Sequence, residues 1–381
     1  MKSVALITEY NPFHNGHVYH AETSKNITES DVTISIMSGS FTMRGEPAIL
    51  NKFKRAQMAI QYVDLVIELP LINAISSGDL FASGGVQIAE MLQCDTLSFG
   101  SESGNIDEFK SAVQQINNLK NDPRYQTMLK EGKSHPRILS ELMDDDSILS
   151  GSNNLLAIEY VKHIIENNFS IEPVTIQRKD NLYLDDTLNQ HTHVSSATSI
   201  RKAYFAHEED YQLSVPQTTA HILNQSQGVN WDDFFPVLKW TILRSTHEEL
   251  RDIYMMTEGL EYKIKKDIQT SDHFEMFIKK LKSKRYTWTR LQRLLTAVLL
   301  NIKTTDVESD EITGIRVLAM TKKGQAYLKS IKDQCPVPII TNVNKKTATL
   351  FSNEIKATEL YQQISGQTET DFNQPVYIRE I

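Results

Sequence analysis

The 381-residue sequence has few cysteines: only Cys94 and Cys335 are present. Two cysteines are too few for a disulfide framework or a zinc cluster, so we expect both to be structural. The sequence also lacks any apolar run near the roughly 20 residues that cross a membrane. It starts with an apolar strand pattern and has no basic leader followed by a cleavage site, so no signal peptide is predicted. These absences argue against a disulfide-stapled or membrane protein and favour a cytoplasmic one.

Positive charge is scarce overall but concentrated in one segment. The chain carries 40 Lys and Arg against 48 Asp and Glu, a net charge of −8. Residues 262–303 hold eleven Lys or Arg and three acids, a net +8, so the remaining chain carries −16. A basic segment on an acidic protein can guide a polyanion to one face, although a solvated lysine-rich helix has the same composition.

Short apolar runs alternate with helical patterns in the first half of the chain. This alternation favours an α/β fold with a Rossmann-like parallel sheet covered on both faces. In such a sheet, ligands bind beyond the carboxyl ends of the strands. After residue 210 the pattern becomes mainly helical, so we predict an α/β domain over 1–210 that would carry the ligand site and a mainly helical domain over 211–381. The expected strands are Val4–Ile7, Val32–Met37, Leu65–Leu69, Thr96–Phe99, Pro173–Gln177, Thr313–Leu318 and Pro338–Thr341.

The stretch from Glu9 to His17, EYNPFHNGH, lies where the first expected strand passes into a helix. A helix N-terminus carries unpaired N–H groups and a positive dipole, so it attracts phosphate. Gly16 allows a ligand to approach the backbone, and His14 and His17, three residues apart, can face the same way. Imidazole N–H groups can donate to phosphoryl oxygens on which charge develops. Two exposed surface histidines or a metal pair are the alternatives, but the Glu of a metalloprotease H-E-x-x-H is missing, and the setting favours a nucleotide pocket.

Three other segments combine hydroxyl, basic or acidic side chains with a turn. Ser195–Lys202 begins with hydroxyl residues and continues into a helix, so Ser199 and Arg201 can hold phosphate, although a capped helix with a surface Arg would look the same. Arg44 lies in the small-residue loop Ser38–Ala48 and can reach an anion. Asp79 fits a helix cap better than a histidine-orienting or magnesium-binding group.

The segment His14-Asn15-Gly16-His17 resembles the H-x-G-H signature of the nucleotidyltransferase superfamily. Read with Gly-Ser-Phe and Arg-Gly-Glu-Pro-Ala in 39–48, the whole stretch is similar to the tRNA(Met) cytidine acetate ligase family. The resemblance implies ATP as a substrate, with Mg²⁺ accompanying the triphosphate, and His14, His17 and Arg201 as catalytic residues. We assign no residue to a metal site. The ATP-binding residues that the resemblance implies are Ile7, Thr8, Glu9, Tyr10, Asn11, Pro12, Phe13, His14, Asn15, Gly16, His17, His20, Gly100, Asn153, Arg178, Ser199 and Arg201.

The segment Lys282–Arg293 mixes basic and aromatic side chains on an amphipathic helix. Basic groups can hold RNA phosphates, and its Thr-x-x-Arg-Leu-Gln-Arg sequence also resembles the family. We therefore expect Lys284, Arg285, Arg290 and Arg293 to contact tRNA.

The resemblance implies an ATP-dependent ligase that forms acetyl-adenylate from acetate and acetylates N4 of the wobble cytidine of elongator tRNA(Met). Two alternatives remain open on the residues alone. One is a small-molecule adenylyltransferase that makes a dinucleotide cofactor, which would not need a basic second half. The other is a non-catalytic nucleotide- or RNA-binding module, which would not need His14, Gly16 and His17 intact.

Overall fold

The computed structural model describes residues 1–131, 133, 135–143, 147–177, 188, 193–308 and 311–380. Its centre is one sheet of eight strands in the order β5-β4-β1-β2-β3-β6-β7, with β8 also paired to β6. The strands are β1 (Ser3–Thr8), β2 (Val32–Ser38), β3 (Leu65–Leu69), β4 (Thr96–Ser101), β5 (Glu172–Gln177), β6 (Ile315–Thr321), β7 (Ile339–Ile340) and β8 (Tyr377–Arg379). All seven expected strands are confirmed within a few residues.

The first five strands are parallel, as the sequence pattern predicted. The chain passes from β1 outward to β2 and β3, and then crosses to the other side of β1 for β4 and β5. The switch point is therefore between β1 and β4, where ligands of such sheets bind. β6 pairs with β3 in the antiparallel direction.

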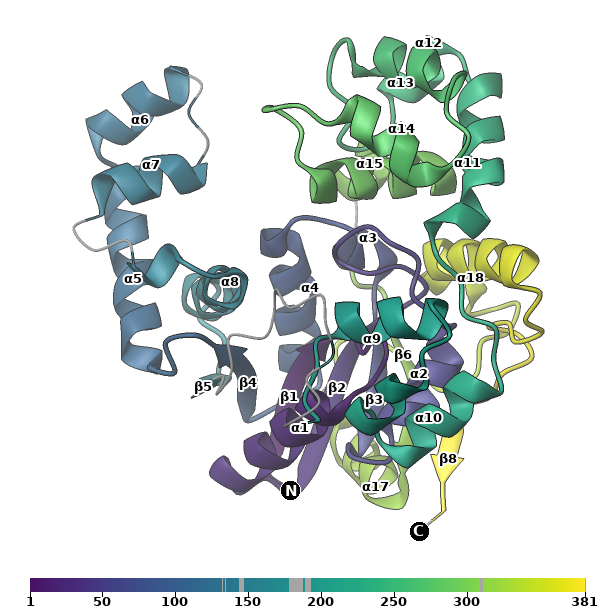
Figure 1. The fold of residues 1–381 in the computed structure, drawn as a ribbon. Helices are drawn as coiled ribbons and strands as arrows, with labels where there is room; N and C mark the ends of the chain where they lie inside the picture. The colour runs from purple at the N-terminus through teal and green to yellow at the C-terminus, as the bar shows by residue number, and fades with distance from the viewer. Residues whose placement is uncertain are drawn as a thin grey trace.

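Helices cover both faces of the sheet, and two further groups of helices, α6–α7 and α11–α15, lie away from it (Figure 1). The helices are α1 (Asn15–Ile27), α2 (Lys52–Ala59), α3 (Leu71–Ala74), α4 (Gly78–Met91), α5 (Ile106–Lys120), α6 (Pro123–Lys130), α7 (His135–Leu142), α8 (Ser152–Glu166), α9 (Ala197–Phe205), α10 (Gln217–Asn224), α11 (Trp231–Arg244), α12 (His247–Arg251), α13 (Leu260–Ile268), α14 (Phe274–Leu281), α15 (Trp288–Leu300), α16 (Thr304–Glu308), α17 (Lys322–Ile331) and α18 (Ser352–Ser365). Short 3-10 turns occur at Ser147–Leu149, Glu209–Ser214 and Ala348–Phe351. None of the helices in the described residues is long and apolar enough to span a membrane.

Alternate residues of each central strand supply two different cores. Val4 and Leu6 of β1 pack with side chains of α1, α2, α9 and α10, whereas Ala5 packs with α4, α5, α8 and α17. This alternation follows from the two-residue period of a strand. Both faces of β1 are largely apolar because both are covered, whereas β2 alternates apolar residues with the buried hydroxyl side chains of Thr33 and Ser35.

Helices α11–α15 form a helical block at the upper right of Figure 1, and their apolar core continues through Phe41 and through residues of α3 and α18. Trp231 and Phe274 stack in this core with ring centroids 4.3 Å apart. The block follows the switch in pattern near residue 210, but β6, β7 and β8 come after it and return to the first sheet. The division into domains 1–210 and 211–381 stays a prediction. The late strands expected near residues 313–341 are present, but that division did not anticipate that they would join the sheet of the first domain.

A buried ion cluster fastens the end of the chain to the sheet. Lys52 Nζ lies 2.8 Å from Glu68 Oε1 and 2.9 Å from Asp371 Oδ1, and all three side chains are almost fully buried. Burial and the neighbouring Asp371 raise the pKa of Glu68 to about 7, although Lys52 opposes this shift. Because Glu68 lies at the carboxyl end of β3, the cluster also borders the loop that follows β2: a Cβ on Gly39 would come within 2.5 Å of Glu68 Oε1.

Candidate active site

His14 and His17 lie at the N-terminus of α1, directly beyond the carboxyl end of β1. His14 is the N-cap: its Nδ1 accepts the Gly16 N–H at 3.1 Å. His17 Nδ1 in turn accepts the His14 N–H at 3.2 Å, which completes a reciprocal capping box. The two rings stack with centroids 3.7 Å apart. The sequence therefore predicted correctly that the two imidazoles share one side of the helix start.

These caps decide which ring nitrogen carries the proton. A nitrogen that accepts a backbone N–H is unprotonated, so each neutral imidazole carries its proton on Nε2. Both rings thus offer an Nε2–H donor beside the positive end of α1. Gly16 makes this arrangement possible, because a Cβ there would come within 2.9 Å of His14 Cε1.

Buried side chains of the same stretch hold the histidines in place. Tyr10 and Phe13 are fully buried, and their ring centroids lie 4.8 and 5.6 Å from that of His17. Asn11 Oδ1 accepts the Ile49 N–H at 2.7 Å, and the peptide bond between Asn11 and Pro12 is cis. These buried residues support the histidine turn from the protein interior, which is a structural role in addition to the predicted contact with ATP.

Asn15 connects the start of α1 to the second predicted phosphate-binding segment. Its amide donates to the carbonyls of His193 and Leu213 at 2.9 and 3.0 Å. These two residues flank the segment that begins α9, so the H-x-G-H turn and the serine-rich turn are adjacent, as the sequence predicted.

Arg201 extends from α9 to the turn between β1 and α1. Its Nη1 donates to the Asn11 carbonyl at 2.8 Å, and its Nη2 lies 3.1 Å from Glu46 Oε1. Ser199 is buried and its Oγ donates to the Ser196 carbonyl at 2.9 Å, while its N–H donates to the N-cap Ser196 Oγ. In this structure Ser199 belongs to the helix cap, and Arg201 is the member of the pair that reaches the histidine turn.

Glu9 binds the loop that follows β2. Its Oε1 accepts the Met43 N–H at 2.5 Å, and its backbone carbonyl accepts from Arg55 Nη1. Burial raises the pKa of Glu9, and Glu46 adds to this, whereas the Met43 N–H, Arg44 and Arg201 oppose it. Arg44 is thus placed close enough to this carboxylate to interact with it, which fits the anion-binding role expected for it. Glu46 was not among the predicted site residues; its place in an Arg-Gly-Glu-Pro turn after a strand was the only signal in the sequence.

The end of β4 forms the other side of the switch point. Gly100 is in β4, and Glu102 follows it. Glu102 accepts the Asn153 side-chain amide at 2.8 Å and the Asn154 N–H at 2.8 Å, so it holds the N-terminus of α8. Glu102 thus connects the strand that contains Gly100 to Asn153, and it was not among the predicted site residues. Arg178 lies outside the described residues.

Three further predicted residues lie along β1 and α1. Ile7 packs against α4, where a Cβ on Gly85 would come within 2.5 Å of it. Thr8 Oγ1 and Ser35 Oγ are 2.8 Å apart, which joins β1 to β2. His20 is half-buried one turn after His17. The structure places Ile7 and Thr8 in the sheet, next to the turn that carries the histidines.

The whole chain resembles known nucleotidyltransferases. A family model described as "HIGH Nucleotidyl Transferase" matches residues 1–374. The tRNA(Met) cytidine acetate ligase of Staphylococcus carnosus (strain TM300) is 47% identical over 377 residues, which is 99% of this chain and 98% of that one. The ligase of the same name from Staphylococcus aureus (strain JH9) is 48% identical over 99% of both chains.

The chain belongs to the tRNA(Met) cytidine acetate ligase family. The crystal structure of Thermotoga maritima TmcAL in its apo form I is 28% identical and covers 100% of both chains with a TM-score of 0.90. The form II structure of the same protein, bound with alpha-thio ATP, has a TM-score of 0.88 at the same coverage. The family's nucleotidyltransferase fold is thus confirmed for this chain.

The four residues expected to contact tRNA differ in their surroundings. Lys284 and Arg285 are exposed in the turn before α15. Arg290 is half-buried, and its guanidinium carbon lies 4.8 Å from the centroid of the Tyr286 ring. Arg293 does not share an exposed face with Arg290: its Nε donates to the Met43 carbonyl at 2.6 Å. The three-residue spacing of Arg290 and Arg293 suggested that they act together, but the side chain of Arg293 extends toward the loop after β2.

Asp79, Glu159 and His163 form a group with the composition of a metal site, and their possible ligand atoms lie within 4.8 Å of one another. Lys162 Nζ, however, is 2.7 Å from Asp79 Oδ1 and 2.8 Å from Glu159 Oε2. The ammonium group already supplies the positive charge between the two carboxylates. Hydrogen bonds from His163 and Lys162 lower the pKa of Asp79. Asp79 therefore connects α4 to α8, instead of acting as the helix cap that we expected.

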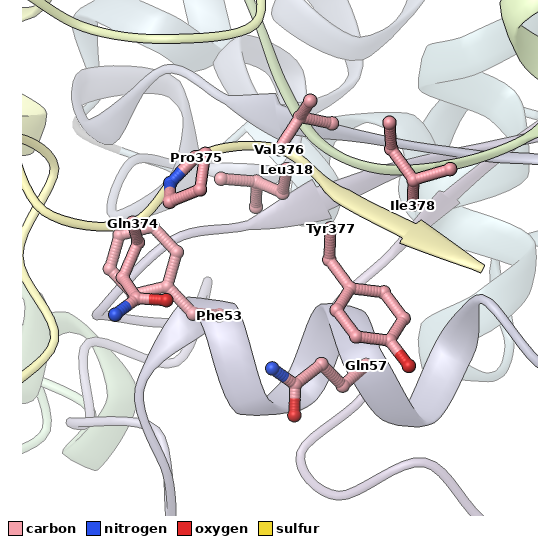
Figure 2. Close-up of a pocket in the computed structure, with 8 residues that line it drawn as sticks. All are labelled: Phe53, Gln57, Leu318, Gln374, Pro375, Val376, Tyr377 and Ile378. Atoms are coloured by element: carbon pink, nitrogen blue, oxygen red, sulfur yellow. The ribbon is translucent and has the colours of Figure 1, made fainter. Parts of the chain in front are cut away.

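A surface cavity of about 180 Å³ lies between α2 and β8 (Figure 2). It is lined by Phe53, Gln57, Leu318, Gln374, Pro375, Val376, Tyr377 and Ile378. None of these is a predicted site residue of the family, and none belongs to the histidine turn.

Proposed function

We propose that this protein uses ATP to activate acetate as acetyl-adenylate and then acetylates N4 of the wobble cytidine of elongator tRNA(Met). The observation that carries the proposal is the pair of capped imidazoles with their Nε2–H groups at the N-terminus of α1. They lie at the switch point of a parallel sheet, in a chain about half identical to tRNA(Met) cytidine acetate ligases along its whole length.

In the first half-reaction an acetate oxygen attacks the α-phosphorus of ATP. A new oxygen–phosphorus bond forms, the bond between the α-phosphorus and the bridging oxygen breaks, and pyrophosphate leaves. Negative charge develops on the phosphoryl oxygens, where the donors of His14 and His17 and the dipole of α1 stabilise it. Because these donors are fixed by backbone caps, little reorganisation is needed at the moment of reaction.

Arg201 would hold the triphosphate. In the structure it is paired with Glu46 and with the Asn11 carbonyl, so it is already aimed at the histidine turn. A triphosphate would compete with the Glu46 carboxylate for the guanidinium group, which binds phosphoryl oxygens in a bidentate manner. Mg²⁺ would enter as the MgATP complex. The carboxylates next to the histidines, Glu9 and Glu46, both have partners, so the ion would be held chiefly by phosphate oxygens.

In the second half-reaction the N4 amine of the cytidine attacks the acetyl carbonyl carbon of the adenylate. The carbon–nitrogen bond forms, AMP leaves, and the amine proton passes to solvent. Neither step needs a nucleophile from the protein, which fits the two cysteines: burial raises the pKa of Cys94 and Cys335 and keeps both thiols protonated. Lys284, Arg285 and Arg290 of the helical block are the proposed contacts to tRNA phosphates. A substrate set of ATP, acetate and tRNA would place the protein in the cytoplasm.

The decisive experiment measures pyrophosphate release from ATP with a panel of carboxylates and mononucleotides, with and without tRNA(Met). We expect acetate to support release without tRNA, and labelled acetate to appear in the tRNA only when all three substrates are present. Release that depends on a mononucleotide and not on acetate would instead identify a small-molecule adenylyltransferase. No release with any substrate, from a folded protein that binds ATP, would favour a non-catalytic binding module.

A further inference from the structure

The backbone of Met43 is held from two sides. Its N–H donates to Glu9 Oε1 at 2.5 Å, and its carbonyl accepts from Arg293 Nε at 2.6 Å. Glu9 belongs to the histidine stretch, whereas Arg293 belongs to α15 of the helical block. One residue, through the two peptide groups that flank it, therefore connects two parts of the chain that are separated by more than 280 residues.

Gly45 brings the helical block into direct contact with the same loop. Its carbonyl accepts from Thr296 Oγ1 at 2.8 Å and from Trp231 Nε1 at 3.1 Å. Its φ is +71°, and a Cβ there would lie 2.3 Å from the backbone nitrogen of Arg293. Glycine is thus required for conformation and for space, and the backbone of α15 rests on the loop without an intervening side chain.

The same loop also carries two side chains of the proposed nucleotide site. Arg44 and Glu46 lie on either side of Gly45, Arg44 interacts with the Glu9 carboxylate, and Glu46 pairs with Arg201. A shift of Met43 would therefore displace both the carboxylate that holds Arg201 and the arginine beside Glu9.

We propose that Arg293 is a positioning residue for adenylate formation and not a tRNA contact. By holding the Met43 carbonyl while Glu9 holds the Met43 N–H, it fixes the loop that places Arg44 and Glu46 at the nucleotide site. The inference rests on the proposed function, since it assigns a role within the ATP-dependent half-reaction. It explains why Arg293, which donates to the Met43 carbonyl, differs from Lys284 and Arg285, which are exposed in the turn before α15.

The charges around Glu9 supply a signature that a purely structural role would not produce. Arg44 (in the loop), Arg201 (from α9), Arg293 (from α15) and Arg55 (from α2) favour its ionised form, and Glu46 and burial oppose it. An ionised carboxylate is the stronger acceptor for the Met43 N–H. As the pH falls through the raised pKa of Glu9, this contact weakens and adenylate formation should decline. Removing Arg293 removes one stabilising cation, so the decline should then begin at a higher pH.

The test compares Arg293→Ala, Arg293→Lys and Glu9→Gln with the wild type in acetate-dependent pyrophosphate release without tRNA, over a range of pH. Lys279→Ala is the matched control, because it removes an exposed cation of the same helical block that pairs with the exposed Glu275. Loss of a charge-assisted hydrogen bond should lower kcat/KM of Arg293→Ala about tenfold or more. Lysine should restore part of the loss, because an ammonium group can also donate to the Met43 carbonyl. The acid limb should move up in Arg293→Ala and vanish in Glu9→Gln.

A second measurement on the same variants uses the salt dependence of tRNA binding. A phosphate contact would reduce the salt slope by about one on removal, whereas a positioning residue would leave it unchanged. Wild-type adenylate formation in Arg293→Ala together with a reduced slope would overturn the proposal and return Arg293 to the RNA face. If Arg293→Ala does not fold, Arg293→Met, which keeps the aliphatic length but neither carries a charge nor donates to the Met43 carbonyl, takes its place, and the same pair of outcomes overturns the proposal. Failure of the wild type to release pyrophosphate with acetate would count against the proposed function, which is a separate result.

Discussion

Replacing His14 by asparagine separates the two tasks that this side chain performs. His14 Nδ1 caps α1 by accepting the Gly16 N–H, and its Nε2–H is the proposed donor to the α-phosphate. The Oδ1 atom of asparagine can take over the first task, since asparagine is among the best N-cap residues. It is too short to replace the second. His14→Asn should therefore fold like the wild type and lose activity.

The expected magnitudes follow from these two contacts. Losing a donor aimed at developing charge reduces the rate by about 10²–10³-fold. Removing the cap altogether, as in His14→Ala, typically lowers helix stability by about 1 kcal/mol, whereas an asparagine cap should keep most of that. His17→Asn should show a similar loss of rate, because the two imidazoles are stacked on the same site.

The assay measures acetate-dependent pyrophosphate release and the urea midpoint for each variant. His207→Asn is the matched control: His207 is exposed and has a φ of +58°, a conformation that asparagine tolerates well. A His14→Asn protein that retains the wild-type midpoint and releases pyrophosphate within a fewfold of the wild-type rate would refute the donor role of Nε2.

Three other predictions concern separate parts of the molecule. Arg201→Ala should abolish most of the thermal stabilisation by ATP, which would be about 2.7 kcal/mol for the wild type at a ligand concentration of 100 Kd; an unchanged shift in melting temperature would show that Arg201 does not hold the triphosphate. Reversing Lys284 and Arg285 to glutamate should impair tRNA acetylation and flatten its salt dependence while adenylate formation without tRNA continues, and full acetylation would mean that RNA binds elsewhere. Lys52→Met should lower the free energy of unfolding by about 3–5 kcal/mol, because it removes the ammonium group that bonds both buried carboxylates and leaves them the more distant guanidinium of Arg316, 3.8 Å from Asp371; a urea midpoint close to that of the wild type would contradict this account of the buried cluster.

The sequence predicted the sheet well because its strands are buried on both faces. All seven residues of β2 and nearly all of β1 are buried; β1 stands out as an apolar run, and β2 stands out as an alternation of apolar residues with Thr and Ser. The same local information identified the histidine turn: a Gly, an Asn-Pro and two histidines between a strand and a helix are chemically unusual within nine residues. Its companion, Arg201, could be proposed from the sequence because hydroxyl residues at a helix start are also a local signal.

Contacts between distant segments could not be predicted in this way. Glu102 holds Asn153, and Glu46 holds Arg201, across 51 and 155 residues. No periodicity links such pairs, so Glu102 and Glu46 were missed, and Asp79 was interpreted as a cap although its partners are in α8.

The sequence by itself determined the family of this protein and the strand, turn and helix that carry the two proposed catalytic histidines, because those residues are contiguous; Arg201, the third proposed catalytic residue, lies far along the chain. Only the tertiary structure decided which way Arg293 extends. Its position on α15 follows from helical spacing, but whether that side of the helix meets solvent or another backbone depends on how the helical block packs. Gly45 allows α15 to approach the loop, and Arg293 then reaches the Met43 carbonyl. Sequence spacing does not encode the packing of distant segments, and this packing decides whether Arg293 contacts RNA or positions the loop beside the proposed ATP site.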